Sequence, residues 1–225
     1  MKFDITVLLD RSGSMQSRKD DHIGGLRSFI KDQKGRGPTD FTLVQFDSSD
    51  PFELVFDGVD IETVDEANVD LIPRGGTPLL DAVGKTVAHI ENRVKDKEDV
   101  QAVLMIITDG GENQSREWNR ERVQKAIKDK ENDWKILYLG ADVNAFDEAY
   151  GLGIGANAAI NFANTSRGTE AAYRTGFSKL NNMRAAYTTG CSKMEALNSA
   201  DYTAEDRQAC ADGNVDLTNN TWSSK

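Results

Sequence analysis

The stretch that decides how this chain folds is residues 5–15, which read ITVLLDRSGSM. Its first five residues are apolar or β-branched, which is typical of a strand buried inside a sheet. The residues that follow place a carboxylate at Asp10 and hydroxyls at Ser12 and Ser14. The carboxyl ends of strands in open α/β sheets face the crevice where ligands bind, and oxygen ligands suit a hard divalent cation. The stretch therefore predicts a strand that ends in a cation-binding loop.

Two later segments offer further oxygen ligands. Thr77 lies in a glycine-containing loop that reads RGGTPL at 74–79. Asp109 lies in the segment IITDG at 106–110, again directly behind an apolar run. Because Asp10 and Asp109 both follow the carboxyl ends of their strands, we expect them at the same crevice.

Each candidate also has a purely structural explanation. Asp10 and Ser12 could make side-chain to backbone hydrogen bonds in a tight turn. Thr77 followed by Pro78 has the pattern of a helix N-cap with proline at the first helical position. Asp109 could cap the segment that follows it. Thr77 could serve as a cap and as a ligand at once, so these alternatives stay open at the level of sequence.

The three segments resemble the metal-ion-dependent adhesion site of von Willebrand factor type A domains, and the resemblance covers roughly residues 2–165. Members of that family carry Asp-x-Ser-x-Ser on a first loop, a threonine on a second loop and an aspartate after a later strand. The resemblance implies Mg²⁺ as the metal, with Mn²⁺ and Ca²⁺ as alternatives, and no catalytic residue. The implied metal ligands are Asp10, Ser12, Ser14, Thr77 and Asp109.

Strand and helix patterns alternate along the chain, which predicts a doubly wound (Rossmann-like), mostly parallel α/β sheet with helices on both faces. A hairpin around 47–51 predicts one antiparallel edge strand, and the apolar strand 100–108 is expected beside the first strand. We assign residues 1–189 to one von Willebrand factor type A-like domain and residues 190–225 to a polar C-terminal extension. Strands are expected at 3–9, 41–46, 52–56, 100–108, 136–139 and 158–162, and helices at 17–34, 80–94, 115–130, 144–151, 168–187 and 203–211.

Several other residues are not assigned to the site. Asp81 lies in the first turn of the helix expected after Thr77, where the helix dipole stabilises a negative charge, so we leave it out of the ligand set. Residues 151–155, GLGIG, follow a predicted helix and precede a strand, which is the reverse of a dinucleotide-binding fingerprint and indicates a helix stop and a turn. His22 and His89 fall within predicted helices and are expected at the surface or half-buried.

Composition limits the functions that need to be considered. The 225 residues, 38% of them hydrophobic, suffice for one full α/β domain with an appendage. The longest apolar run is 102–107, so we expect no membrane contact and a cytoplasmic protein. Residues 1–165 carry 20 basic and 30 acidic side chains, which disfavours nucleic acid as a partner. Cys191 and Cys210 are expected as free thiols, with a disulfide as the alternative.

The resemblance implies metal-dependent protein binding without catalysis. Hydroxyl ligands are neutral, so a bound Mg²⁺ keeps much of its charge and accepts a carboxylate from a Glu or Asp of a partner protein. The chain is similar to compact intracellular bacterial and phage members, which implies an AAA+ ATPase or a kinase system as a partner class. The oligomeric state is left open.

Two other functions stay open. The first is a metal-assisted hydrolase that uses Asp10 as a nucleophile or Asp109 to orient water. The sequence lacks a second aspartate two residues after Asp10 and a Gly-x-Ser-x-Gly motif, which disfavours that function. The second is a structural or assembly subunit in which the metal only stabilises the fold.

Overall fold

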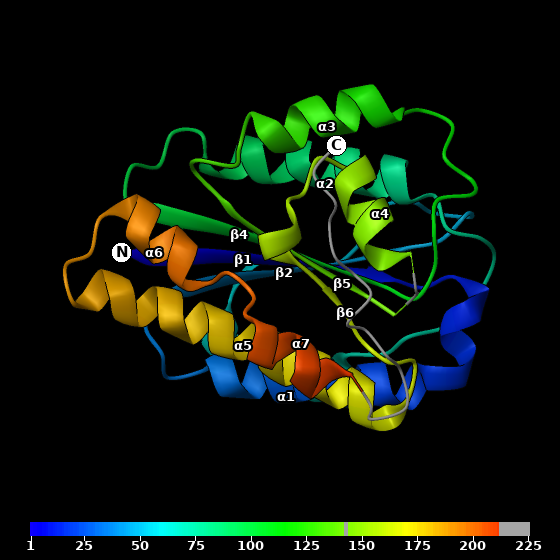
Figure 1. Ribbon diagram of the computed structural model, residues 1–225, viewed down its shortest axis with the longest axis horizontal. Helices are drawn as coiled ribbons and strands as arrows, with labels where there is room; N and C mark the ends of the chain where they lie inside the picture. Colours follow the sequence, from blue (N-terminus) through cyan, green and yellow to red (C-terminus); the bar gives the residue numbers. More distant parts are fainter. Residues whose placement is uncertain (142–143, 212–225) are drawn as a thin grey trace.

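One sheet of six strands, in the order β3-β2-β1-β4-β5-β6, runs through the middle of the protein (Figure 1). The structure is a computed structural model that describes residues 1–141 and 144–211. All neighbouring strands in the sheet are parallel except the pair β2 and β3, which is antiparallel and lies at one edge. The predicted fold class and the predicted pairing of the first strand with β4 are therefore confirmed. The strands are β1 (Lys2–Asp10), β2 (Thr39–Phe46), β3 (Glu53–Asp60), β4 (Val100–Thr108), β5 (Lys135–Gly140) and β6 (Ala159–Asn161).

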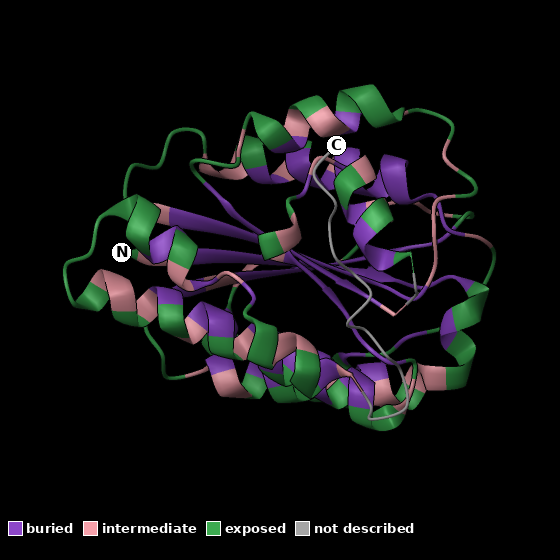
Figure 2. Ribbon diagram, viewed as in Figure 1, coloured by how far each residue is buried: buried purple, intermediate pink, exposed green. Residues whose placement is uncertain are grey.

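Helices cover both faces of the sheet, so the strands other than the edge strand β3 are buried from two sides (Figures 1 and 2). One face packs against α1, α5, α6 and α7, and the other packs against α2, α3 and α4. The helices are α1 (Lys19–Gln33), α2 (Leu79–Val94), α3 (Arg120–Lys128), α4 (Ala145–Gly151), α5 (Ser166–Thr188), α6 (Lys193–Ser199) and α7 (Ala204–Cys210). Short 3₁₀ turns are η1 (Gly13–Arg18), η2 (Ile61–Thr63), η3 (Glu66–Asn68) and η4 (Ala156–Ala158).

The central strand β1 shows how the two-sided burial is achieved. Val7 and Leu9 belong to the core under α1 and α5, whereas Leu8 belongs to the core under α2. Asp4 is also fully buried, and both of its carboxylate oxygens accept hydrogen bonds from Arg93 of α2, at 2.7 Å and 2.5 Å. Charged groups are buried without great cost only when they are paired in this way. The strand is thus held on both faces, which fixes the position of its carboxyl end.

Some element boundaries differ from the prediction. The helix predicted at 17–34 begins with the 3₁₀ turn η1 and becomes α-helical only at Lys19. Strand β3 continues to Asp60, beyond residue 56, where the predicted strand ends. Gly58 has a φ of +59°, and the pairing of β2 with β3 shifts register between Phe41 and Leu43. The additional residues of β3 therefore pair with β2 beyond an irregular, bulge-like point in the sheet.

The third helix begins later than predicted. The prediction starts this helix at residue 115, but α3 starts at Arg120, and Asn119 caps it by accepting the N–H of Arg122 at 3.0 Å. The Ser115 hydroxyl instead accepts the backbone N–H of Asp81 at 3.0 Å. Because that hydroxyl is used by α2, the segment around Ser115 stays a loop that crosses to the neighbouring helix.

The described part of the C-terminal extension contains two short helices. The helix predicted at 203–211 is present as α7, with a capping box between Thr203 and Asp206. Helix α6 was not predicted, although the pattern S-x-x-E formed by Ser192 and Glu195 is a capping box at its start. Both helices add side chains to the core beneath α5, among them Leu197 of α6. The remaining residues of the predicted extension, 212–225, lie outside the described residues.

The cysteines and histidines are placed as follows. Cys191 is exposed and Cys210 is buried, and both are free thiols. His89 is partly exposed and its Nε2 lies 2.7 Å from Asp57. His22 was expected at the surface or half-buried, but this expectation is wrong, because α5 covers it and its Nδ1 lies 3.3 Å from the hydroxyl of Tyr173.

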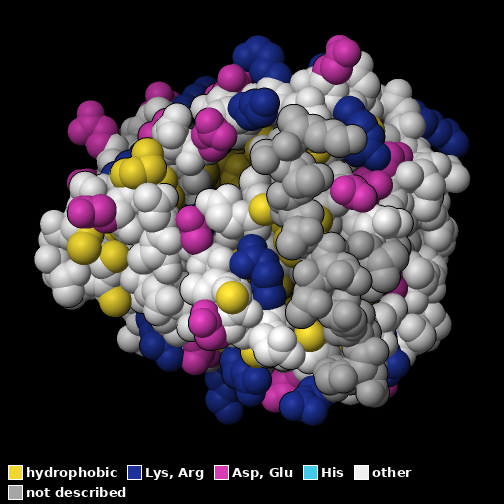
Figure 3. Space-filling view, viewed as in Figure 1, with side chains coloured by type: hydrophobic (Ala, Val, Ile, Leu, Met, Phe, Trp, Pro, Cys, Tyr) yellow, Lys and Arg dark blue, Asp and Glu magenta, His cyan; other side chains and the backbone are white. Residues whose placement is uncertain are grey.

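Figure 3 shows how charged side chains are distributed on one face of the protein. On the face drawn in Figure 3, acidic and basic side chains are interspersed rather than gathered into one basic patch. No helix in residues 1–141 and 144–211 combines the length and the apolar character needed to cross a bilayer.

Candidate metal centre

The predicted ligands come from three loops at the carboxyl edge of the sheet. Asp10 is the last residue of β1, and Ser12 and Ser14 lie in the turn after it. Asp109 directly follows β4, which pairs with β1 in parallel with Leu9 beside Ile107. The third loop carries the threonine and leads into α2. Parallel pairing of β1 and β4 is what brings two of the loops together.

Direct hydrogen bonds join the first loop to the aspartate after β4. The hydroxyl of Ser14 donates to Asp109 Oδ1 at 2.6 Å, and the hydroxyls of Ser12 and Ser14 are 3.0 Å apart. Since the single hydroxyl proton of Ser14 goes to the carboxylate, Ser12 is the donor between the two serines. Three of the predicted ligands therefore form one chain of oxygen atoms.

Asp10 shapes the turn that presents the serines. Its Oδ1 accepts the backbone N–H of Ser12 at 2.6 Å, and its Oδ2 accepts the hydroxyl of Thr108 at 2.6 Å. Asp10 therefore makes the side-chain to backbone hydrogen bond of a tight turn, as one of the sequence-based alternatives proposed. It also lies in the same cluster as the serines. Thr108 was not singled out from the sequence, although it is the polar residue that ends the apolar strand before Asp109.

Thr77 reaches the cluster through the third loop. A methyl group built on Gly110 would lie 3.5 Å from Thr77 Oγ1 and 3.8 Å from Ser14 Oγ, so both hydroxyls face the same glycine. The backbone of Thr77 is held by Asn113, whose Oδ1 accepts the Thr77 N–H at 2.8 Å and whose own N–H donates to the Thr77 carbonyl at 3.0 Å. Asn113 was missed in the sequence because nothing local marks it.

The helix-cap role that the sequence left open for Thr77 is not taken. Helix α2 begins at Leu79 and its N-cap position is Pro78, while Glu112 and Ser115 accept first-turn N–H groups of the helix, at 2.8 Å and 3.0 Å. Asp81, which we left out of the ligand set, accepts three backbone N–H groups at 2.7–2.9 Å from residues 116–118. Its oxygens therefore order the loop after β4.

Burial and charge at the cluster favour a bound cation. Asp10 is fully buried and Asp109 is 9% exposed, whereas Ser14 is exposed. Burial raises the pKa of Asp10 to about 6, and the charge of Asp109 acts in the same direction, against the hydrogen bonds from Thr108 and Ser12. A positive ion beside these two carboxylates would stabilise their charged forms.

The donor set fits a hard divalent cation. Two carboxylates and three hydroxyls are all oxygen donors, the type that Mg²⁺, Mn²⁺ and Ca²⁺ prefer. Among residues 1–141 and 144–211, no group of three or more His, Cys, Asp or Glu side chains could hold a metal ion. A cation at this cluster would therefore depend on neutral hydroxyls for much of its coordination.

Neither histidine contacts the serines of the cluster. The hydroxyls of Ser12 and Ser14 bond to each other and to Asp109, while His22 contacts Tyr173 and His89 contacts Asp57. A nucleophilic serine needs an adjacent general base within hydrogen-bond reach. Neither Ser12 nor Ser14 therefore has a histidine as a general base.

The glycine run 151–155 is a helix stop and a turn, as predicted. Helix α4 ends at Gly151, and Gly153 has a φ of +87°, a conformation that favours glycine. The short turn η4 and strand β6 follow. The glycines therefore lie after a helix rather than between a first strand and a helix.

Comparison with known structures finds the same fold in several proteins. The proximal thread matrix protein 1 from the mussel byssus superposes with a TM-score of 0.60 at 18% identity over 79% of this chain and 48% of that chain. A von Willebrand factor type A protein from Catenulispora acidiphila gives 0.60 at 14% identity, over 80% and 43%. The pilus adhesin SpaC from Lactobacillus rhamnosus GG gives 0.64 at 13% identity, over 80% and 31%.

The chain spans less than half of the length of each of these three proteins. A search of curated proteins found no match. The model of the von Willebrand factor type A domain, in contrast, matches residues 4–169, a range that contains every predicted ligand. The chain therefore belongs to the von Willebrand factor type A domain family.

Proposed function

We propose that this chain is a metal-dependent protein-binding module. The observation that carries the proposal is the contact of Ser14 with Asp109, because it joins the first loop to the aspartate after β4. The hydroxyl of Thr77 faces the same point across Gly110. The five oxygen-bearing side chains that we propose as ligands are Asp10, Ser12, Ser14, Thr77 and Asp109.

The ligands divide into two kinds. Asp10 and Asp109 supply negative charge, and the three hydroxyls supply neutral oxygen atoms. With Mg²⁺ as the proposed ion, and Mn²⁺ or Ca²⁺ as alternatives, the bound metal supplies a positive centre that accepts an oxygen atom from outside. Ser12 and Thr77 are buried while Ser14 is exposed, so the cluster opens to solvent on the Ser14 side.

A carboxylate of a partner protein is the ligand that we propose for the open side. It would be a Glu or Asp side chain, because a carboxylate is the anionic oxygen ligand that proteins offer to hard cations. Structures of the same fold include a pilus adhesin and a matrix protein of the mussel byssus. One structure of the matrix protein is described as having zinc in its metal-ion-dependent adhesion site (MIDAS) motif. For the partner itself we propose an AAA+ ATPase or a kinase system.

Metal binding is tested by calorimetric titration of the metal-free protein with MgCl₂. We expect one ion to bind the wild type and the affinity to fall at least tenfold in Asp109→Asn, which keeps the size of the side chain but removes its charge. The control is Asp147→Asn, an exposed acidic residue on α4 outside the cluster. Equal affinity in Asp109→Asn and the wild type would contradict the proposed site.

Partner binding is tested separately by affinity capture from a cell extract. The protein is immobilised in Mg²⁺ or in EDTA, and Asp10→Ala is run beside the wild type. We expect one protein to be retained only by the wild type in Mg²⁺, and its purified form to lose binding when an acidic surface residue is replaced by its amide. Retention that persists in EDTA would contradict recognition through the ion.

A further inference from the structure

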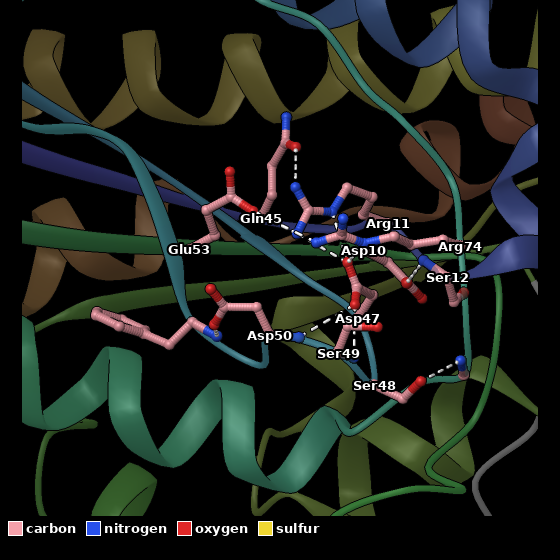
Figure 4. A network of polar contacts seen from close by, with 12 residues as sticks. Asp10, Arg11, Ser12, Gln45, Asp47, Ser48, Ser49, Asp50, Glu53 and Arg74 are labelled. Carbon is pink, nitrogen blue, oxygen red and sulfur yellow. Dashed lines mark hydrogen bonds and ion pairs between the residues drawn. The ribbon is translucent and has the colours of Figure 1, made fainter.

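Asp47 lies at the end of β2, outside the proposed ligand set, yet two of the site loops meet at its carboxylate (Figure 4). Asp47 Oδ2 accepts hydrogen bonds from Arg11 Nε at 2.8 Å and from Arg74 Nε at 2.9 Å. Arg11 stands between Asp10 and Ser12 in the first loop. Arg74 begins the loop that carries the threonine ligand. One buried oxygen atom therefore joins the two loops through their arginines.

The other oxygen of Asp47 fixes the hairpin loop between β2 and β3. Its Oδ1 accepts the backbone N–H groups of Ser49 at 2.6 Å and Asp50 at 3.1 Å. The next residue, Ser48, uses its hydroxyl to accept the N–H of Gly76 at 2.9 Å. The hairpin loop is thus ordered by Asp47 and in turn holds the residue before Thr77 in place.

Backbone contacts couple the same two loops directly. The N–H of Arg74 donates to the carbonyl of Arg11 at 2.9 Å, and the N–H of Gly13 donates to the carbonyl of Gly75 at 3.0 Å. Gly75 has a φ of +64°, and a methyl group built on it would lie 2.3 Å from the hydroxyl of Ser48. Any shift of the arginines would therefore be transmitted to the backbone on both sides of the proposed metal.

The charges require Asp47 to stay ionised. Arg11 is almost fully buried, and its Nη2 lies 2.8 Å from Asp47 Oδ2 and 2.6 Å from Glu53 Oε2. Burial alone would raise the pKa of Asp47, but hydrogen bonds from Ser49 and Arg74 outweigh it and hold the pKa below its ordinary value. Glu53 also lies 3.8 Å from Arg74 Nη2, but it is 42% exposed, so it is a more solvated partner of the same two arginines than the buried Asp47.

We infer that Asp47 is a positioning residue for the metal site, and that its pairing with Arg11 and Arg74 sets how the serine loop faces the threonine loop. This inference rests on the proposed function. Residues that orient metal ligands without touching the ion commonly change metal affinity when they are replaced. The β2–β3 hairpin, which supplies no ligand, thereby becomes part of the binding site.

The test compares Asp47→Asn with Asp50→Asn by titration of both metal-free proteins with MgCl₂. The amide that replaces the Asp47 carboxylate could still accept the N–H groups of its own hairpin, but it lacks the charge that holds the arginines. Asp50 is a matched control on the same hairpin. Its carboxylate accepts the backbone N–H of Phe52 at 3.0 Å and, among the described residues, makes no hydrogen bond to either arginine. We expect the affinity to fall roughly 10- to 100-fold in Asp47→Asn and to stay within about twofold in Asp50→Asn.

Stability is measured on the same samples to separate positioning from folding. Titrations are run well below the unfolding temperature of each metal-free variant, where near-ultraviolet circular dichroism shows native packing. If Asp47→Asn lowers the unfolding temperature but binds Mg²⁺ as tightly as the wild type, the inference is overturned. If the wild type itself binds no Mg²⁺, the proposed function has failed instead.

A milder variant covers the case in which Asp47→Asn does not fold. Ser48→Ala removes only the hydrogen bond to the N–H of Gly76. One hydrogen bond contributes about 0.5–1.5 kcal/mol, so we expect the Mg²⁺ affinity to fall by roughly two- to tenfold. Unchanged affinity in Ser48→Ala would also count against the inference.

Discussion

The hydroxyl of Ser14 lies 2.6 Å from a carboxylate oxygen of Asp109, although 95 positions separate the two residues in the sequence. The contact exists because β1 and β4 are parallel neighbours whose carboxyl ends lie at the same edge of the sheet. Each residue comes within a few positions of the end of its strand, so the pairing of the strands is sufficient to bring them together. The candidate site is therefore a direct product of sheet topology.

Metal binding should stabilise the fold. A ligand present at about 100 times its dissociation constant adds about 2.7 kcal/mol to the free energy of unfolding, if it binds only the folded state. For a domain of this size we expect MgCl₂ to raise the unfolding temperature by roughly 5–10 °C. Asp109→Asn should show no such rise in a thermal melt monitored by circular dichroism. A rise of the same size in both proteins would place the ion elsewhere.

His22 should make stability depend on pH. Burial lowers its pKa to about 4, with Asp21 acting in the opposite direction and Arg18 in the same one. Between pH 6.5 and pH 4 the unfolded chain binds a proton at this position and the folded chain does not, so stability falls as the pH falls through that range. The loss attributable to this residue should be about 3 kcal/mol.

The measurement compares urea unfolding of the wild type and His22→Phe at about pH 7 and about pH 4.5, two values that span most of that range. The difference between the two proteins isolates the histidine from the many carboxylates that also titrate. His22→Phe removes the hydrogen bond to Tyr173 at both pH values, so that cost cancels in the comparison. Identical pH dependence in the two proteins would show that His22 does not contribute.

Arg93→Met should destabilise the protein strongly. The substitution leaves the carboxylate of Asp4 buried and without its bidentate partner. Breaking a buried ion pair from one side costs about 3–5 kcal/mol, whereas replacing both partners by apolar residues can be nearly neutral. The double variant Asp4→Val/Arg93→Met should therefore recover much of the loss in urea unfolding. A loss below about 1 kcal/mol in the single variant would contradict the pairing.

Helix α6 should contribute to the stability of the whole domain. Leu197 is 4% exposed and packs into the core beneath α5, whereas Met194 on the same helix is 48% exposed. Leu197→Ala should lower the free energy of unfolding by about 2–5 kcal/mol, since it removes buried apolar volume. Met194→Ala should change it by no more than about 0.5 kcal/mol. Equal effects of the two substitutions would mean that α6 does not pack as described.

Much of the fold could be predicted because its signals are local. The apolar residues of β1 and β4, the stripe of α2 and the capping box of α7 each lie within one short window of sequence. Helix α6 carried a capping box of the same kind, so it could have been found as well. The start of α3 could not be predicted, because the hydroxyl of Ser115 accepts the backbone N–H of Asp81 on another helix. His22 was misplaced for a similar reason, since the burying residues come from α5.

The sequence by itself determined the strands, the fold class, the family and the identity of the candidate ligands. Periodicity and residue chemistry are properties of short segments, and they persist whatever the rest of the chain does. Only the tertiary structure decided that Ser14 faces Asp109 and that Asp47 joins the loops of Arg11 and Arg74. These contacts depend on which strands become neighbours and on how their connecting loops cross. Their cause is long-range packing, which no single segment encodes.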